Sequence, residues 1–290
     1  MKPFKAVILG SENYHAIGLA KDLLQGYLPS VELIGMYGED DASNQMMRDM
    51  GVPNVGKDPF AFVKEANLVL VTTRHGDTHL PLVRPYMQPG NIIWVDKPLA
   101  IKETDFASLL KEAETAGAIL WGSSFLPKAK AFAPLISGVK QPGDLGKLCG
   151  GMIASPVRRE AEFGGFFFYT QHLVEIAIGI FGKEIKEVFA TEAPNGYSVI
   201  LRYADFDVSG VYHEGTFHYD ASACFEGGTL HGHVTPTDVS TMHQVVLDEI
   251  AFAIKEDKAP LTHAEMELPF RLLHKLYDSL QSGKFETVDN

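Results

Sequence analysis

Residues 4–25 read FKAVILGSENYHAIGLAKDLLQ, and this stretch decides the fold of the first part of the chain. The run FKAVIL ends at Gly10, which is typical of a buried strand in a parallel sheet. From His15 to Gln25 the apolar residues recur at helical spacing. A buried strand, a glycine turn and an amphipathic helix together predict the first unit of a doubly wound α/β fold.

The same alternation continues to about residue 122. We expect further strands at residues 31–37, 67–73, 92–95 and 119–122, with one helix after the acidic turn at 38–41 and another over 104–116. The last of these helices ends at Gly117, a residue type that commonly caps helix C-termini. Strands separated by helices of this length predict a parallel, doubly wound sheet.

The pattern changes after residue 122. Strand-like segments at 148–155, 185–191, 197–203, 208–214 and 217–225 are linked by hairpin-length turns, and two helices over 240–255 and 264–280 close the chain. Short turns between strands indicate antiparallel pairing. We therefore predict an α/β protein with a Rossmann domain at residues 1–122, followed by an α+β domain at 123–290 with an open, mostly antiparallel sheet.

Composition excludes several classes of protein. The 290 residues carry 25 Lys and Arg against 37 Asp and Glu, so the net charge of −12 has the wrong sign for coating nucleic acid or an anionic membrane. No apolar run reaches about 18 residues, and the first ten residues lack a signal-peptide pattern. The two cysteines cannot form a disulfide framework. We expect a soluble, cytoplasmic protein that contacts neither nucleic acid nor membrane.

The turn after the first strand, GSENYH at residues 10–15, occupies the place of a dinucleotide-binding fingerprint. That fingerprint needs glycine at three positions, and only Gly10 is present, because Glu12 and His15 replace the other two. The N-terminus of the following helix could still hold phosphate through its backbone N–H groups. On the turn alone, a cofactor site and a plain turn between strand and helix are both open.

The stretch VDKPLA at residues 95–100 carries a stronger signal. It follows a buried strand, so Lys97 projects at the carboxyl end of the parallel sheet, where such folds bind ligands. Pro98 restricts the backbone that presents Lys97. A lysine there could hydrogen-bond a substrate oxygen and assist its proton transfer, although an isolated lysine in such a loop can also be a plain surface residue.

Two further segments complete a recognisable pattern. The third strand leads into a Thr-x-x-x-x-x-His turn at residues 73–79, and Gly164-Gly165 leads to His172-x-x-Glu175 in a helix that ends at Gly182. Together with VDKPLA these segments resemble the glucose–fructose oxidoreductase/inositol dehydrogenase (Gfo/Idh/MocA) family over nearly the whole chain. The resemblance implies a Rossmann domain, a second domain that binds substrate and mediates oligomerisation, and an NAD(P)-dependent dehydrogenase of a sugar-, cyclitol- or polyol-like alcohol.

The resemblance also implies roles for single residues. It makes Lys97 and His172 the catalytic residues that assist proton transfer from the hydroxyl group. The expected cofactor-binding residues are Gly10, Ser11, Asn13, Tyr14, His15, Glu39, Thr72, Thr73 and Lys97. The expected substrate-binding residues are His79, Lys97, Tyr169 and His172. It further implies a homodimer or larger homo-oligomer formed through the sheet of the second domain, and no metal.

The chain departs from the family pattern at Phe168, where an Asp is usual, and at residues 123–127 (SSFLP), where an Arg is usual. Losing the carboxylate at Phe168 favours a less polar substrate or a changed reaction. Two other functions therefore stay open. One is a diverged protein of the same fold that binds a ligand or partner without redox turnover, and the other is a lyase or hydrolase that uses the cofactor transiently.

Two groups of polar residues remain ambiguous. The acidic turn at 39–41 favours NAD over NADP, since Glu39 could accept a hydrogen bond from a ribose and would repel a 2′-phosphate, but a solvated acidic turn explains it equally well. His231 and His233 would share one face of a strand and could bind one metal ion. No spacing in the sequence completes such a site, so ordinary sheet-face histidines are the simpler interpretation.

Overall fold

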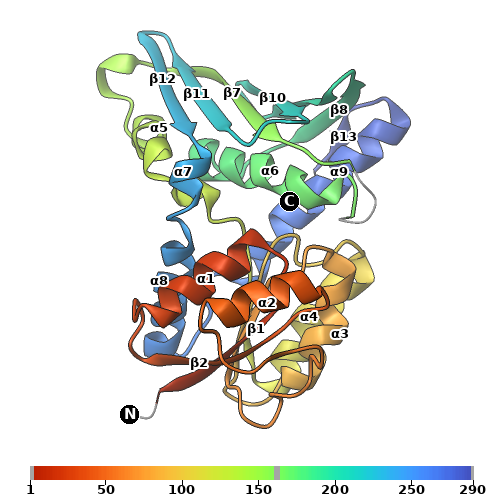
Figure 1. Ribbon diagram of the computed structural model, residues 1–290. Coiled ribbons are helices and arrows are strands. Elements are labelled where there is room, and N and C mark those ends of the chain that lie inside the picture. Colours follow the sequence, from red (N-terminus) through yellow and green to blue (C-terminus); the bar gives the residue numbers. More distant parts are fainter. Residues whose placement is uncertain (1–2, 160–163, 289–290) are drawn as a thin grey trace. The chain divides into compact units, whose positions relative to one another are not determined.

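The structure is a computed structural model that describes residues 3–159 and 164–288. These residues form two compact units (Figure 1). The first comprises the chain up to Ser123 together with Thr241–Met266, and the second comprises Ser124–Ser240 and the chain from Glu267 onward. The chain thus enters the second unit next to the predicted boundary, returns to the first unit for one helix, and ends in the second.

The first unit is built on a parallel sheet with the strand order β3-β2-β1-β4-β5-β6. Its strands are β1 (Phe4–Leu9), β2 (Val31–Tyr37), β3 (Val55–Gly56), β4 (Leu68–Val71), β5 (Ile92–Val95) and β6 (Ile119–Trp121). Every pairing between them is parallel. The central strands β4 and β5 are buried along their whole length, as strands covered on both faces must be. The predicted doubly wound sheet is confirmed.

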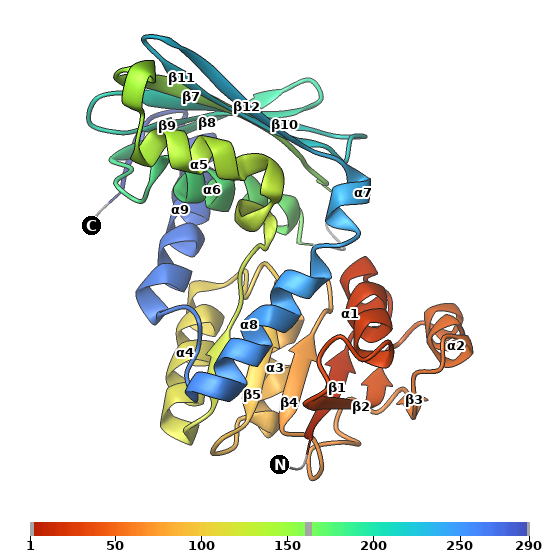
Figure 2. The same ribbon diagram turned by 90° about the vertical axis from the view of Figure 1, so that its left-hand side faces the viewer.

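The helices of the first unit cover both faces of this sheet (Figure 2). They are α1 (Tyr14–Leu24), α2 (Asp41–Asp49), α3 (His79–Val83), α4 (Glu103–Ala116) and α8 (His243–Glu256). Helix α8 comes from far along the chain, yet it packs beside α1 and reaches β5. A Cβ on Gly18 would lie 2.0 Å from Nδ1 of His243, so the close approach of α1 and α8 requires glycine at that position.

The second unit contains a mixed sheet with the strand order β12-β11-β7-β10-β9-β8-β13. Its strands are β7 (Leu148–Pro156), β8 (Glu187–Ala193), β9 (Gly196–Arg202), β10 (Asp207–His213), β11 (Tyr219–Phe225), β12 (Gly228–Val234) and β13 (Glu286–Thr287). Strands β7 and β10 pair in parallel, and the other neighbours among the described strands pair antiparallel. The prediction of a mostly antiparallel sheet is confirmed.

Helices lie on one face of this sheet (Figure 1). They are α5 (Ala133–Lys140) and α6 (Phe167–Phe181), together with the second-unit part of α9 (His263–Ser282), while the short α7 (Pro236–Val239) follows β12. Burial alternates along β10, because every second side chain faces these helices. No helix in the described parts of the chain combines the length and the apolar content that a membrane span requires.

Candidate functional site

The turn after β1 depends on glycine at one position. Gly10 has a φ of +120°, and a Cβ there would lie 2.5 Å from the backbone nitrogen of Thr73. The hydroxyl of Thr72 donates to the carbonyl oxygen of Gly10 at 2.7 Å. The carboxyl ends of β1 and β4 are therefore held edge to edge, which is the position where doubly wound folds bind ligands.

Asn13 caps helix α1 and connects it to the ends of two strands. Its side-chain oxygen accepts from the backbone N–H of His15 at 3.0 Å. Its amide nitrogen donates to the carbonyl oxygen of Thr72 at 2.8 Å and contacts Oδ2 of Asp96 at 3.3 Å. The capping residue thereby fixes the N-terminus of α1 over the ends of β4 and β5.

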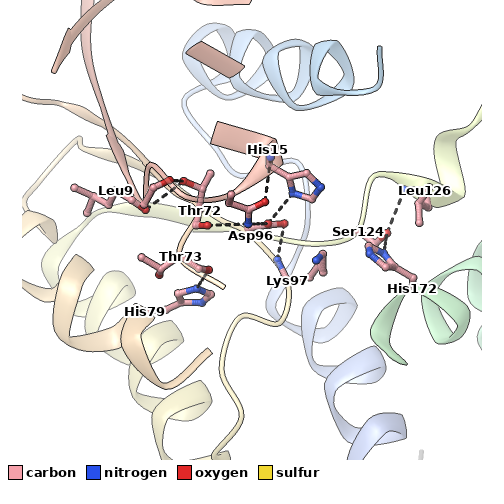
Figure 3. A network of polar contacts seen from close by, with 12 residues as sticks. Leu9, His15, Thr72, Thr73, His79, Asp96, Lys97, Ser124, Leu126 and His172 are labelled. Carbon is pink, nitrogen blue, oxygen red and sulfur yellow. Dashed lines mark hydrogen bonds and ion pairs between the residues drawn. The ribbon is translucent and has the colours of Figure 1, made fainter. Parts of the chain in front are cut away.

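His15 and Asp96 form a buried hydrogen-bonded pair beside Lys97 (Figure 3). Nδ1 of His15 lies 2.7 Å from Oδ2 of Asp96, whose other oxygen accepts from the backbone N–H of Lys97 at 2.8 Å. Burial alone would raise the pKa of Asp96, but the charges of His15 and Lys97 and these hydrogen bonds hold it well below its usual range. Lys97 itself is only 3% exposed. The network therefore fixes the backbone from which Lys97 projects.

Glu12 brings a carboxyl group to the position of the second glycine. Burial raises the pKa of Glu12, and the charges of Glu39 and Asp40 add to that effect. The charge of Arg74 acts in the opposite direction, and its guanidinium donates to the carbonyl oxygen of Glu12 at 2.6 Å. An acidic side chain and a compensating cation thus lie together at the N-terminal end of α1.

The end of β2 carries the predicted acid. Glu39 accepts a hydrogen bond from the hydroxyl of Tyr37 at 2.8 Å. Burial, together with this hydrogen bond and the charge of Glu39, raises the pKa of Tyr37 to about 12. Tyr37 is therefore a neutral donor at physiological pH, and it orients the carboxylate of Glu39.

Ser11 points toward the same strand end rather than toward α1. A Cβ on Gly38 would lie 1.8 Å from the hydroxyl oxygen of Ser11 and 2.4 Å from Oδ1 of Asn44. Both oxygens are buried and have no hydrogen-bond partner among the described residues. These two oxygens lie next to Glu39, and a bound ligand or an ordered water would supply the hydrogen bonds that they lack.

These features were tested against the requirements of a dinucleotide. Gly10 allows the close approach of two strand ends, α1 offers a helix N-terminus, and Glu39 is placed to accept from a ribose hydroxyl. Glu12 is the exception, because a carboxylate at this position would repel a diphosphate, while Arg74, bonded to the backbone of Glu12, supplies a positive charge. The residues present therefore fit the adenosine half of a dinucleotide. They fit the diphosphate where the positive charge of Arg74 offsets the negative charge of Glu12.

His79 links the loops after β4 and β5. Its Nε2 lies 2.8 Å from the carbonyl oxygen of Thr73, and its Nδ1 lies 3.1 Å from that of Leu99. The side chain is fully buried, and burial lowers the pKa of its imidazole. The hydroxyl of Thr73 is bonded to that of Thr78 at 2.8 Å. These contacts suit His79 to positioning the loop that carries Lys97.

In the second unit, His172 lies in a separate buried cluster on α6. Its Nδ1 is 2.7 Å from the hydroxyl oxygen of Ser124, and its ring contacts the aromatic rings of Tyr169 and Tyr219 at centroid distances of 5.6 and 5.4 Å (Figure 3 shows Ser124 and His172). Glu175, one helical turn further along, accepts from the backbone N–H of Ser124. The cluster offers a histidine whose orientation is fixed by a hydroxyl and two aromatic rings.

The structure unites some of the predicted residues and separates others. Gly10, Asn13, His15, Thr72 and Lys97 belong to one network through Asp96 and the strand ends. Tyr14 is instead half exposed, and its ring contacts that of His243. Sequence reasoning missed Arg74, Ser124, Tyr219 and His243 as site residues. The segment at 123–127 was noted only for its missing Arg, because no pattern indicates that a serine there reaches a helix 48 positions away.

The histidines of β12 have other partners. His231 is bonded to Ser222 at 2.9 Å, and His233 pairs with Asp220 at 2.5 Å. Among the residues that the structure describes, no group of three or more His, Cys, Asp or Glu side chains is arranged to hold a metal ion.

Comparisons with known proteins were made on sequence and on structure. No family model and no curated protein matches the chain. Solved structures do match over nearly its full length: myo-inositol 2-dehydrogenase from Lactobacillus plantarum at 14% identity and a TM-score of 0.83, covering 99% of this chain and 100% of that one. Scyllo-inositol dehydrogenase from Lactobacillus casei, crystallised with NAD(H) and scyllo-inositol, matches at 15% identity and 0.79, covering 99% of each chain.

A third structure agrees with these two. Myo-inositol dehydrogenase from Lactobacillus casei, in complex with NAD(H) and myo-inositol, matches at 12% identity and a TM-score of 0.80, covering 99% of this chain and 97% of that one. The fold of this chain is therefore that of the inositol dehydrogenases, in both units. The resemblance read from the sequence is confirmed at the level of the fold.

Proposed function

We propose that the protein is an NAD-dependent oxidoreductase that acts on a polyol-like alcohol. The observation that carries the proposal is the buried His15–Asp96 pair, which fixes Lys97 at the carboxyl end of the parallel sheet. Lys97 is buried, its backbone N–H is bonded to Asp96, and a lysine at this edge of the sheet is suited to contact a substrate oxygen. The fold shared with dehydrogenases that were crystallised with NAD(H) and an inositol supports the same conclusion.

The cofactor would be held by residues of the first unit. These are Gly10, Ser11, Asn13, Tyr14, His15, Glu39, Thr72, Thr73 and Lys97. When bound, NAD supplies a nicotinamide ring that takes up a hydride. Glu39, oriented by Tyr37, would accept from a ribose hydroxyl and would repel the 2′-phosphate of NADP. The acidic residues around Glu12 add to that preference for NAD.

The chain's own residues would handle the proton. In this proposal the ammonium group of Lys97 hydrogen-bonds the reacting hydroxyl oxygen, and His172 takes the hydroxyl proton as the carbon loses hydride. Tyr169 and His79 would complete the substrate contacts, Tyr169 beside the ring of His172 and His79 through the loop that carries Lys97. The reverse reaction would return the proton from His172 to a carbonyl oxygen.

The substrate would be less hydroxylated than an inositol at one point. Phe168 is buried and packs against the ring of Tyr169 at a centroid distance of 4.7 Å, so an apolar side chain takes the place of the family's carboxylate. A buried carboxylate can anchor a hydroxyl group, whereas a phenyl ring cannot. We therefore propose a polyol that carries an apolar substituent, or lacks a hydroxyl group, where it faces Phe168.

The proposal includes a homodimer formed through the open face of the seven-stranded sheet. One row of outward-facing residues crosses the sheet from β8 to β12 without a Lys, Arg, Asp or Glu, and Met152 in its centre is 54% exposed. The row consists of Phe189, Ile200, Ser209, Met152, Ser222 and His231. An uncharged, partly apolar face suits a second copy of the chain. Both cysteines are free thiols, which suits a cytoplasmic location.

One observation favours a second candidate, a protein of this fold that binds a ligand or partner without redox turnover. Glu12 stands at the position of the second glycine of the fingerprint, and burial raises the pKa of its carboxyl group. The first experiment therefore titrates the full chain with NAD(H) and NADP(H) while recording tryptophan fluorescence, since Trp94 lies on β5 two residues before Asp96. Micromolar binding of NAD, followed by turnover in a polyol screen, supports the dehydrogenase. Absence of binding at millimolar nucleotide supports the second candidate instead.

A further inference from the structure

Ser124 is bound through both its backbone and its side chain. It follows β6 and lies in the second unit, where it is buried. Its backbone N–H donates to both carboxylate oxygens of Glu175, at 3.0 and 2.9 Å. Its hydroxyl oxygen accepts from the backbone N–H of Leu126 at 3.2 Å. Backbone and side-chain bonds together fix the position of this hydroxyl group.

The hydroxyl of Ser124 is also bonded to the histidine of the proposed reaction. The distance from its oxygen to Nδ1 of His172 is 2.7 Å, which is short for a hydrogen bond between these atoms. The ring of His172 is further confined by Tyr169 on one side and by Tyr219 in an edge-on contact at 5.4 Å. A ring held in this way has one orientation, with Nδ1 toward Ser124 and Nε2 on the opposite edge.

The bond between Ser124 and His172 can run in either direction, and one direction leaves Nε2 of His172 free to accept a proton. A hydroxyl oxygen has two lone pairs, and the N–H of Leu126 uses one of them. The second lone pair can accept Nδ1–H, which leaves Nε2 unprotonated and able to act as a base. When Nε2 then takes a proton, Nδ1–H keeps the same partner, so the imidazolium form needs no rearrangement.

We propose that Ser124 is a positioning residue that holds His172 in the tautomer with the proton on Nδ1. This inference rests on the proposed function, in which His172 accepts the hydroxyl proton. It adds that the atom which accepts the proton is Nε2. It also gives the segment at 123–127, which lacks the family's usual arginine, a role of its own, because this segment contains the serine that orients the base.

Glu175 is the anchor of this arrangement. Its carboxylate lies on the same helix as His172 and is bonded to the backbone N–H of Ser124 and to the side-chain amide of Gln171. Substitution of the Ser124 side chain keeps the backbone bond to Glu175. Variants at Ser124 therefore retain this attachment of the segment to α6, and their effects report on the hydroxyl group.

The direct test is the tautomer of His172, measured by long-range 1H–15N correlation on the full chain with 15N-labelled histidine. The signals of His172 among the 11 histidines are identified by their absence in His172→Gln. Near pH 8 we expect a protonated Nδ1 and an unprotonated Nε2. In Ser124→Ala the proton should redistribute between the two nitrogens, whereas Ser124→Thr, which keeps a hydroxyl, should retain the original pattern.

Ser123→Ala is the matched control, because it removes the neighbouring hydroxyl and leaves the bond to His172 in place. Kinetics with NAD and the polyol that is oxidised fastest in the screen give the second readout. We expect Ser124→Ala to lower kcat/KM by about tenfold and to shift the acidic limb of its pH profile, with Ser124→Thr within about twofold of wild type.

The two readouts separate this inference from the proposed function. Ser124 has no such role if wild-type His172 carries its proton on Nε2, or if Ser124→Ala leaves the nitrogen signals unchanged. Neither result depends on turnover. If the tautomer responds as expected while the wild-type protein oxidises no polyol in the screen, the positioning role stands and the dehydrogenase proposal is the one that fails.

Discussion

Nδ1 of His15 lies 2.7 Å from Oδ2 of Asp96, both side chains are buried, and His15 stands where the dinucleotide fingerprint has its third glycine. The departure from the glycine turn at His15 is therefore linked to the segment that carries Lys97. A buried imidazole in the first turn of α1 needs a partner, and the acid before Lys97 supplies it. In turn, the same carboxylate is bonded to the backbone of Lys97.

Removing one member of this pair should destabilise the protein. We expect Asp96→Asn to lower the free energy of unfolding at pH 7 by about 3 kcal/mol, because it leaves His15 buried beside a neutral group. His15→Gln should cost less when Asp96 is already Asn than it does in the wild type. Urea denaturation of the single and double variants measures this coupling. An exposed acid, changed in Asp205→Asn, serves as the control.

The same pair gives stability a defined dependence on pH. The folded-state pKa of Asp96 is depressed, so its contribution is present above the unfolded value of about 3.9 and is lost as pH falls toward the folded value. We expect the stability difference between wild type and Asp96→Asn to narrow by about 1 kcal/mol between pH 6 and pH 3. A difference that stays constant over this range would contradict a depressed pKa.

Lys97→Ala tests the proposed chemistry. Losing the ammonium group should reduce kcat/KM by 100-fold or more, because the developing charge on the substrate oxygen loses its partner. NAD affinity, measured by fluorescence, should fall by a smaller factor than kcat/KM, because eight other proposed residues also hold the cofactor. The control is Lys102→Ala, five residues after Lys97. It removes an exposed lysine that pairs with Asp77, and it should keep wild-type turnover. Equal rates for Lys97→Ala and wild type would remove Lys97 from the mechanism.

Most of the fold could be predicted from the sequence, since periodicity reports burial directly. The strands over 31–37 and 92–95 were placed at their observed bounds because they are apolar runs between turn residues. The two-residue strand β3 was missed for its length, and the bounds of β12 were not predicted, although His231 and His233 were expected to share one face of a strand. The attachment of α8 to the first unit was also missed, because an amphipathic face does not reveal which sheet it will cover.

The candidate site was less predictable. Lys97 stands in a motif whose backbone context is local, so its position at the end of β5 followed from the sequence. Contacts that join distant segments did not, and they include the pairing of His15 with Asp96 and of Ser124 with His172. A buried polar pair requires complementary shape as well as chemistry, and one sequence holds no record of which partners meet.

Glu12 should make cofactor affinity depend on pH. Because burial raises its pKa, Glu12 takes up a proton at a higher pH than an ordinary glutamate, and the neutral form opposes the diphosphate less. We expect NAD to bind more tightly to the wild-type protein as pH falls from 8 to 5.5. Both Glu12→Gln and Glu12→Gly should bind about tenfold more tightly at pH 8 and should lose most of this dependence.

The control for Glu12 removes a negative charge at the far end of the sheet. Glu65→Gln affects an exposed carboxylate that pairs with Lys5 at the start of β1, so its NAD affinity should match that of the wild type at every pH. Titration by calorimetry at three pH values decides the matter. If Glu12→Gln binds NAD no better than wild type does, the carboxyl group does not face the diphosphate.

The open face of the second sheet should be an interface between two copies of the chain. Met152 lies in the centre of its uncharged row, so Met152→Glu would bury two like charges near a twofold axis and should convert a dimer to a monomer. Size-exclusion chromatography with light scattering measures the mass directly. Met46→Glu, on helix α2 and 41% exposed, introduces the same charge elsewhere and should leave the dimer intact. A wild-type protein that elutes as a monomer would show that this face forms no stable interface. A Met152→Glu variant that stays dimeric would place the interface on another surface.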